Sequence, residues 1–295
     1  MQHNRPSRTA YRVAMRRAAH QIIDSPVVFE DPLSLPILGP ERALSMRQDA
    51  AREERGPAAP YLRAFLAVRS RFAEETLDRC VKAGVRQYVI LGAGLDTFAY
   101  RNPHRAAGLH VFEVDHPSTQ AWKRELLDGA GLPVPDSVTF VPVDFERQSF
   151  ADQLQGVGFR KGTGAFFSWL GVTPYLRLEA VRNALHSIAD LAGTSGGVVF
   201  DYSIPPSRLG YLQRLAFRRM ASRVEAAGEP WITFFNPEEL AADLHSMGFR
   251  DVEDLAGEEI NRRYFDDRTD GLRVGGAGHI VKALVSPSGL PLRPE

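Results

Sequence analysis

The sequence predicts an α/β fold built on a doubly wound sheet of seven strands, the last of them antiparallel. Short apolar runs alternate with segments of helical periodicity along most of the chain, a rhythm typical of parallel strands covered by helices on both faces. The first of these runs leads into a glycine turn, VILGAGLDT at 89–97, and the next two runs each end in an acid. Together these features indicate a Rossmann-like nucleotide-binding arrangement.

The glycine turn narrows the class of ligand. Gly92 and Gly94, with Ala93 between them, permit backbone angles closed to other residues and let main-chain N–H groups approach a ligand closely. Thr97 stands where a dinucleotide fingerprint requires a third small residue. The sequence also contains no G-x-x-x-x-G-K-[ST] motif. A site for a pyrophosphate is therefore disfavoured.

Acids follow the two apolar runs after the turn. Glu113 and Asp115 close the run LHVFEV, about 20 residues beyond the turn, where a nucleotide-binding βαβ unit places an acid for ribose hydroxyls. The run VTFVPVDF at 138–145 contains Asp144 followed by Phe145. An acid for ribose and an acid for an adenine amino group suit a nucleoside better than a dinucleotide, and S-adenosylmethionine fits this pattern.

The remaining elements are expected in alternation. Helices are predicted up to residue 23, over 61–83 and 178–192, and from Asn236 to Gly248; strands are predicted over 165–172, 196–203, 251–255 and 279–285. The charged stretch between Pro32 and Pro60 reads as a solvated helix or loop. We therefore expect an N-terminal helical cap at 1–83, a core at 84–286 with a helical insertion at about 205–235, and a disordered tail at 287–295.

Composition excludes several classes of partner. The 295 residues carry 36 basic and 36 acidic side chains, which gives no basic footprint for nucleic acid or an anionic membrane. A single cysteine, Cys80, excludes an internal disulfide and fits a reducing, cytoplasmic location. The histidines lack metal-ligand spacing, so no metal is expected. The Arg-rich N-terminus could be an organelle transit peptide, but its apolar pattern continues without a break and favours an ordinary helix.

Several motifs resemble one enzyme family. The run VILGAGLDTFAYR, together with FEVDHP at 112–117 and VDF at 143–145, is similar to the leucine carboxyl methyltransferase family of S-adenosylmethionine-dependent O-methyltransferases. The likeness continues in FEDPLS at 29–34, RSRF at 69–72 and SWLGVTPYL at 168–176, so it spans most of the chain. The resemblance implies that the N-terminal helices cover the active site.

The resemblance also implies roles for single residues. Arg69 would clamp the methionine carboxylate, Asp115 would accept from the ribose, and Asp144 would accept from the adenine amino group with Phe145 flanking the ring. The residues expected to bind the cofactor are Arg69, Gly92, Ala93, Gly94, Glu113, Asp115, His116, Asp144, Phe145, Ser168, Trp169 and Leu170.

One position departs from the family pattern. Many members carry a glutamate five residues before the tyrosine of the fourth-strand motif, whereas this chain has Leu170 before Tyr175, preceded by Trp169. A cofactor contact made by that carboxylate is therefore absent or replaced. The apolar motif resembles bacterial members, including tailoring enzymes of natural-product pathways, and disfavours a protein C-terminal leucine as substrate.

The expected reaction is methyl transfer to a carboxylate of a small molecule or peptide, with a hydroxyl as the other possible acceptor. A carboxylate is ionised at neutral pH and needs no general base. The catalytic residue is unknown from sequence; His116 and Tyr175 are the candidates. The alternative function is a nicotinamide-dependent reductase using the same βαβ unit, which Thr97 and the lack of a Tyr-x-x-x-Lys pair disfavour. The protein is expected to be a monomer or homodimer.

Overall fold

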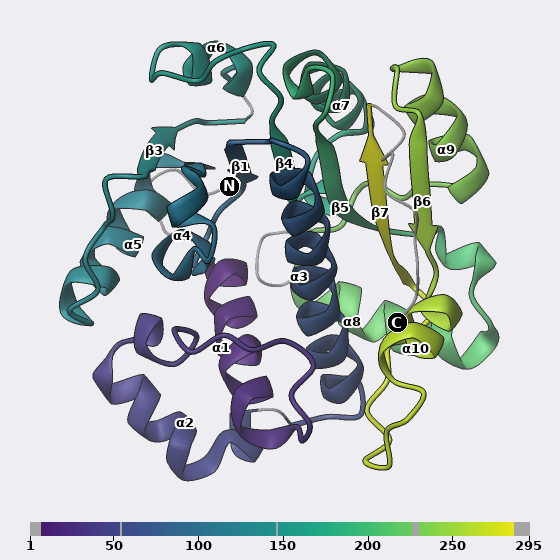
Figure 1. The fold of residues 1–295 in the computed structure, drawn as a ribbon. Helices are drawn as coiled ribbons and strands as arrows, with labels where there is room; N and C mark the ends of the chain where they lie inside the picture. The colour runs from purple at the N-terminus through teal and green to yellow at the C-terminus, as the bar shows by residue number, and fades with distance from the viewer. Residues whose placement is uncertain (1–6, 54, 146, 226–229, 286–295) are drawn as a thin grey trace.

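The computed structural model describes residues 7–53, 55–145, 147–225 and 230–285. Within them lies one seven-stranded sheet in the order β3-β2-β1-β4-β5-β7-β6 (Figure 1). The strands are β1 Gln87–Leu91, β2 His110–Asp115, β3 Val138–Pro142, β4 Phe166–Trp169, β5 Gly197–Ser203, β6 Asp251–Leu255 and β7 Gly278–Leu284. The first five strands pair in parallel, and β7 is antiparallel to both β5 and β6. The predicted fold class is confirmed.

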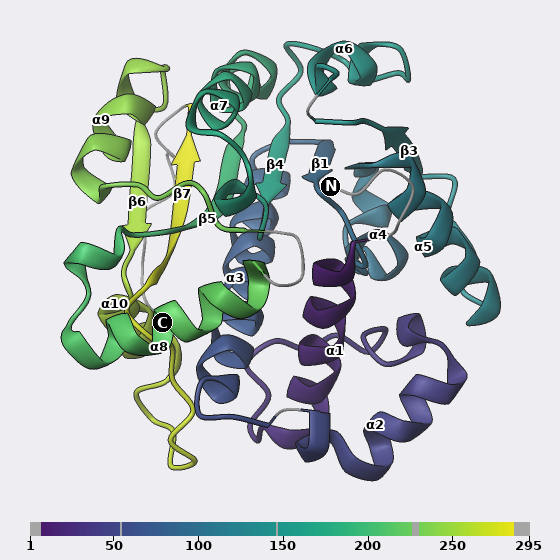
Figure 2. The same cartoon turned by 180° about the vertical axis from the view of Figure 1, so that it is seen from behind.

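Helices cover both faces of this sheet (Figures 1 and 2). The α-helices are α1 Arg8–Ile23, α2 Pro40–Glu53, α3 Ala59–Lys82, α4 Phe98–Arg101, α5 Pro117–Gly129, α6 Phe150–Gln155, α7 Leu178–Ala192, α8 Tyr211–Glu225, α9 Pro237–Ser246 and α10 Gly257–Tyr264. Short 3-10 helices include η3 Thr173–Tyr175 and η4 Pro206–Arg208. Among the described residues, no helix combines the length and apolar character needed to span a membrane.

Two apolar clusters hold the helices to the sheet. Side chains alternate along a strand, so Val89 and Leu91 of β1 enter the cluster with α7 and α9, while Ile90 enters the cluster with α3 and α10. Every residue of β1 is buried, as expected for a parallel strand covered on both faces. The continuous apolar runs of the sequence therefore follow from the two-sided cover.

The N-terminal helices divide between two places. α3, which was expected to lie in the cap, packs Val68 and Phe72 into the cluster on the sheet and so belongs to the helical layer of the core. α1 and α2 instead form a third cluster with Leu95, next to the glycine turn, and with Leu127 of α5. Of the three N-terminal helices, α1 and α2 therefore cover the end of the sheet, and α3 connects them to its face.

Two strands end earlier than predicted. β3 ends at Pro142 and β4 at Trp169, which leaves residues 143–145 and 170–172 in turns at the carboxyl edge of the sheet. Gly171 adopts a positive φ of 73°, a backbone angle that is incompatible with a continuing strand. The insertion after β5 is formed by η4 and α8, while the predicted disordered tail lies outside the described residues.

Candidate functional site

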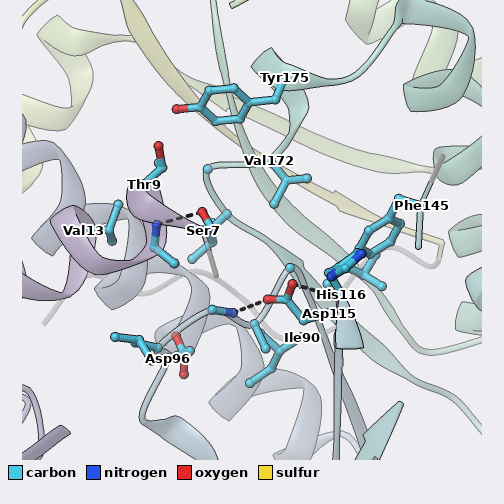
Figure 3. Close-up of a pocket in the computed structure, with 18 of the residues that line it drawn as sticks. Ser7, Thr9, Val13, Ile90, Asp96, Asp115, His116, Phe145, Val172 and Tyr175 are labelled. Carbon is cyan, nitrogen blue, oxygen red and sulfur yellow. Dashed lines mark hydrogen bonds between the residues drawn. The ribbon is translucent and has the colours of Figure 1, made fainter. Parts of the chain in front are cut away.

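A cavity of about 350 Å³ lies at the carboxyl edge of the sheet, where open α/β sheets bind their ligands. The turns after β1, β2, β3 and β4 line it from the sheet side, and α1 lines it from the cap (Figure 3). Its walls include Ser7, Thr9, Ala10, Val13, Arg17, Arg69, Gly92, Ala93, Gly94, Asp96, Asp115, His116, Asp144, Phe145, Ser168, Leu170, Gly171, Val172, Tyr175 and Ile232.

The glycine turn and Asp115 form the floor of the cavity. The Gly94 N–H donates to Asp115 Oδ2 at 2.5 Å, and the His116 N–H donates to Asp115 Oδ1 at 2.6 Å. Burial raises the pKa of Asp115, although both N–H donors and Lys123 oppose the rise. A Cβ on Gly92 would lie 2.4 Å from Val172 Cγ2. The absence of a side chain at Gly92 is therefore what allows the turns after β1 and β4 to approach.

Arg69 is a buried residue of the cavity wall. Its side chain is 8% exposed, and Nη1 donates to Asp201 Oδ2 at 2.9 Å. The other oxygen of Asp201 accepts from the Gly171 N–H at 2.5 Å. The carboxylate therefore fixes both the guanidinium of α3 and the turn after β4. Asp201 is not among the site residues predicted from sequence, although an acid inside the apolar run GVVFDYS is a visible signal.

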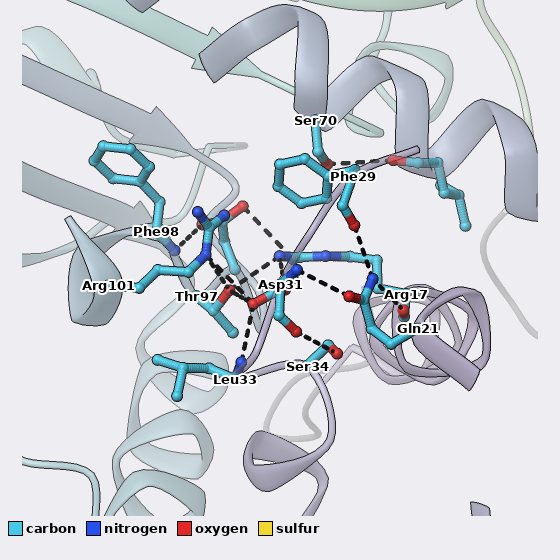
Figure 4. Close-up of polar contacts among 12 residues, drawn as sticks. Arg17, Gln21, Phe29, Asp31, Leu33, Ser34, Ser70, Thr97, Phe98 and Arg101 are labelled. Carbon is cyan, nitrogen blue, oxygen red and sulfur yellow. Dashed lines mark hydrogen bonds and ion pairs between the residues drawn. The ribbon is translucent and has the colours of Figure 1, made fainter. Parts of the chain in front are cut away.

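Arg17 joins α1 to the glycine turn. Its Nη2 donates to Asp31 Oδ2 at 2.5 Å and to Thr97 Oγ1 at 3.1 Å, and Thr97 Oγ1 donates to Asp31 Oδ1 at 2.7 Å (Figure 4). Arg101 lies on the other side of Asp31, with Nε 3.3 Å from Oδ1. Thr97, whose size disfavoured a dinucleotide, thus holds the cap in place.

Asp144, Phe145 and His116 also line the cavity, and Figure 3 shows Phe145 and His116 on the side away from α1. The ring centroid of Phe145 lies 6.4 Å from that of Phe150. Packing against this core residue fixes the position of the Phe145 ring. His116 is the N-cap of α5: its Nδ1 accepts from the Ser118 N–H at 3.3 Å. The same Nδ1 also lies 2.7 Å from Ser118 Oγ, so this nitrogen of His116 is engaged at the start of α5.

Two of the predicted cofactor-binding residues do not line the cavity. Glu113 is fully buried below Asp115, where its carboxylate bonds Lys123 Nζ at 2.8 Å and the Tyr100 hydroxyl at 3.1 Å. Trp169 is also fully buried and packs on Phe200 in the core. Glu113 lies too deep in β2, and Trp169 faces away from the cavity because strand side chains alternate. A cofactor contact from either side chain is not supported.

The end of β4 supplies the next two residues of the wall. Ser168 lines the cavity and its Oγ accepts from the Tyr88 hydroxyl at 2.8 Å. Leu170 lines the cavity as well and presents an apolar side chain to it. Figure 3 shows Tyr175 with its hydroxyl pointing towards Thr9 of α1. The cap residues Ser7, Thr9 and Val13 carried no recognisable motif in the sequence.

Comparisons with known proteins define the class. A relative from Bacillus subtilis (strain 168), named "Putative S-adenosyl-L-methionine-dependent methyltransferase YktD", is 31% identical over 303 residues, which cover 96% of this chain and 99% of the relative. A protein of the same description from Mycobacterium tuberculosis (strain H37Rv) is 34% identical over 189 residues, covering 62% of this chain and 60% of the relative. A solved structure described as a possible exported protein from Bordetella parapertussis shares the fold, with a TM-score of 0.51, 15% identity and 95% of each chain covered.

Fold, glycine turn and relatives together define an S-adenosylmethionine-dependent methyltransferase. The family model described as leucine carboxyl methyltransferase matches residues 10–189, a span that runs from α1 to α7 and includes every turn of the cavity up to η3. The chain belongs to the leucine carboxyl methyltransferase family. Nothing in these comparisons supports the reductase alternative.

Proposed function

We propose that the enzyme transfers a methyl group to an oxygen of a carboxylate, forming a methyl ester on a small molecule or peptide. When bound, S-adenosylmethionine supplies an electrophilic methyl group on a sulfonium. The protein's part is to hold the acceptor oxygen in line with that methyl group and to exclude water. The observation that carries the proposal is the geometry of His116, because the Nδ1 atom of this histidine of the cavity wall caps α5.

The binding position of the cofactor is proposed from the order of side chains along the carboxyl edge of the sheet. Asp115 stands at the end of β2 for the ribose, and Asp144 with Phe145 stands after β3 for the adenine. Arg69 stands on the opposite side of the glycine turn for the methionine carboxylate. The buried acid beside Gly94 fits a nucleoside bound next to the turn.

The nature of the acceptor is proposed from what the cavity offers as a base. Transfer to a hydroxyl needs a group that removes a proton, whereas a carboxylate does not. The Nδ1 atom of His116 already accepts a hydrogen bond, and both oxygens of Asp115 accept from backbone N–H groups. The first turn of α1, which lines the cavity, contains no acid, so the positive end of its dipole favours an anionic acceptor. The other acid beside the glycine turn, Asp96, has a lowered pKa with Arg17 Nη1 at 3.6 Å from Oδ2, which makes it a weak base. Together these features suit an acceptor that arrives ionised.

Two finer points remain proposals. The apolar Leu170 and the half-exposed Ile232 at the cavity wall favour a natural-product type of acceptor with apolar surface, consistent with secondary metabolism. The buried thiol of Cys80 fits a reducing compartment and hence the cytoplasm.

The test is a matched acceptor screen with S-adenosylmethionine labelled in the methyl group. Each candidate acid is paired with the alcohol and the phenol of the same carbon skeleton. Label transferred to the acid should be released as methanol by mild base, because esters hydrolyse under conditions that leave methyl ethers intact. Base-stable label on the alcohol or phenol, with none on the acid, would overturn the proposal.

A further inference from the structure

A loose pair of opposite charges lines the cavity on its cap side. Arg17 Nη1 lies 3.6 Å from Asp96 Oδ2, with side-chain exposures of 6% and 21%. That separation is an ion pair without a hydrogen bond. Both residues belong to the cavity wall, Arg17 from α1 and Asp96 from the glycine turn itself.

One oxygen of Asp96 is left for a ligand. Oδ1 accepts from the Phe98 N–H at 2.8 Å, which is the local reason for an acid before α4. Oδ2 accepts no hydrogen bond from the residues that the structure describes; the guanidinium at 3.6 Å is its nearest charged partner. The hydrogen bond from the Phe98 N–H therefore engages only one of the two oxygens of Asp96.

Arg17 is likewise only partly used. Its Nη2 is taken by Asp31 and Thr97, and its buried Nε has no partner within the described part of the chain. Burial by itself would raise the pKa of Asp96, but Arg17, Lys123 and Arg101 outweigh burial and lower it. The carboxylate at the cavity wall is thus held ionised.

The other acids of the wall are committed elsewhere. Asp115 accepts from two backbone N–H groups, and Asp144 lies at the end of the cavity proposed for adenine. Leu170 is apolar, so that position of the wall offers no charge. Among the described residues of the wall, Asp96 is therefore the ionised acid beside the glycine turn that still has an oxygen available to a ligand.

We propose that Asp96 binds the α-ammonium group of the methionine part of the cofactor through Oδ2, and that Arg17 orients this carboxylate. An α-amino acid end is a zwitterion, and a wall with Asp96, Arg17 and Arg69 presents the complementary charges. The inference rests on S-adenosylmethionine as cofactor and is independent of the acceptor proposed above. A failed acceptor screen would leave it standing.

The test uses Asp96→Asn and four ligands measured by calorimetry. Asparagine keeps an oxygen for the Phe98 N–H and removes only the charge. S-adenosylhomocysteine carries ammonium and carboxylate, its decarboxylated analogue only the ammonium, its deaminated analogue only the carboxylate, and methylthioadenosine neither. The control is Asp243→Asn, which removes an acid from α9 outside the cavity. Thermal melts of both variants verify folding.

The variant should weaken the two ammonium-bearing ligands by roughly tenfold to a hundredfold, the range of a hydrogen bond to a charged group. It should leave the deaminated analogue and methylthioadenosine within about twofold of wild type, and the control should change none of the four. Equal loss for all four ligands would show that Asp96 only supports the turn, and no loss for any would show that another group binds the ammonium. Either result overturns the proposal.

Discussion

At the scale of the residue, the site depends on arginines that are buried and already paired. Arg69 gives one of its five N–H donors to Asp201, so the plane of the guanidinium is fixed before a ligand arrives. A lysine at the same position would keep the charge but lose the planar fork. Arg71, two residues further along α3, is 43% exposed and pairs with Glu75 on the same helix, which makes it a suitable comparison.

We expect Arg69→Lys to narrow the difference in affinity between S-adenosylhomocysteine and methylthioadenosine. Only S-adenosylhomocysteine carries a carboxylate, so only its affinity should fall when the guanidinium is removed. Titration calorimetry on both ligands measures the difference. Arg71→Lys should leave it unchanged. If Arg69→Lys melts like wild type and the difference persists, the carboxylate is bound by another residue.

Substitutions of Asp115 and Glu113 distinguish a residue that contacts the ligand from one that supports the structure. Asp115→Ala should reduce the affinity for S-adenosylhomocysteine by about 1.5 to 3 kcal/mol, the scale of hydrogen bonds to a charged group. Glu113→Gln should leave that affinity unchanged but lower the free energy of unfolding by about 3 to 5 kcal/mol, because Lys123 loses its buried partner. Calorimetry and chemical denaturation of each variant measure the two quantities. The reverse pattern would show that Glu113 is the ribose acid.

At the scale of the element, the cap is attached through buried polar clusters as well as apolar packing. At the end of α1, Arg63 of α3 donates to both oxygens of Asp24 at 2.7 and 2.8 Å, and His20 Nδ1 lies 2.7 Å from Asp24 Oδ2. His20 Nε2 accepts from the N–H groups of Val28 and Phe29. This cluster sets the path of the chain towards Asp31 and hence the position of Arg17.

Asp24→Asn should destabilise the protein by about 3 to 5 kcal/mol at neutral pH, the usual result of breaking a buried ion pair. Burial tends to raise the pKa of Asp24, but Arg63 and His20 outweigh it and lower the pKa. A carboxyl whose pKa is lowered on folding stabilises the protein above its unfolded pKa and loses that effect as the pH falls through the folded value.

The difference in unfolding free energy between wild type and Asp24→Asn should therefore shrink once the pH falls below about 4. Urea denaturation at a series of pH values measures it. The exposed pair between Lys161 and Asp190 provides a control, since Asp190→Asn should cost no more than about 1 kcal/mol at any pH. A difference for Asp24→Asn that does not depend on pH would rule out its ionisation as the cause.

At the scale of the whole molecule, a ligand that binds between cap and sheet must stabilise the complete fold. The cavity is lined by α1, by α3 and by the turns after four strands, so unfolding any of these elements destroys the site. Binding then adds to the free energy of unfolding by mass action.

S-adenosylhomocysteine at a hundredfold excess over its Kd should stabilise the protein by about 2.7 kcal/mol, visible as a rise in Tm in a thermal melt. NAD and ATP at the same concentration should not change the Tm, because the glycine turn lacks the third small residue and no P-loop is present. A rise with NAD and none with S-adenosylhomocysteine would revive the reductase alternative.

Local sequence was sufficient for the fold class and for the turns that bear the site. Apolar runs ending in Gly92, Asp115 and Asp144 predict parallel strands whose carboxyl ends meet at one edge, because strand and turn preferences act over a few residues. The departure at Leu170 is also visible from sequence and directs attention to a missing carboxylate.

Tertiary structure alone decided which side chains face the cavity. Glu113 and Asp115 lie on the same side of one strand, yet only the packing of α5 and Tyr100 over Glu113 buries it away from a ligand. Arg69 is a mid-helix charge in the sequence and a buried partner of Asp201 in the fold, 132 residues apart. Asp96 meets Arg17 because Asp31 and Thr97 dock α1 on the turn. Such contacts join distant segments, so no local pattern encodes them.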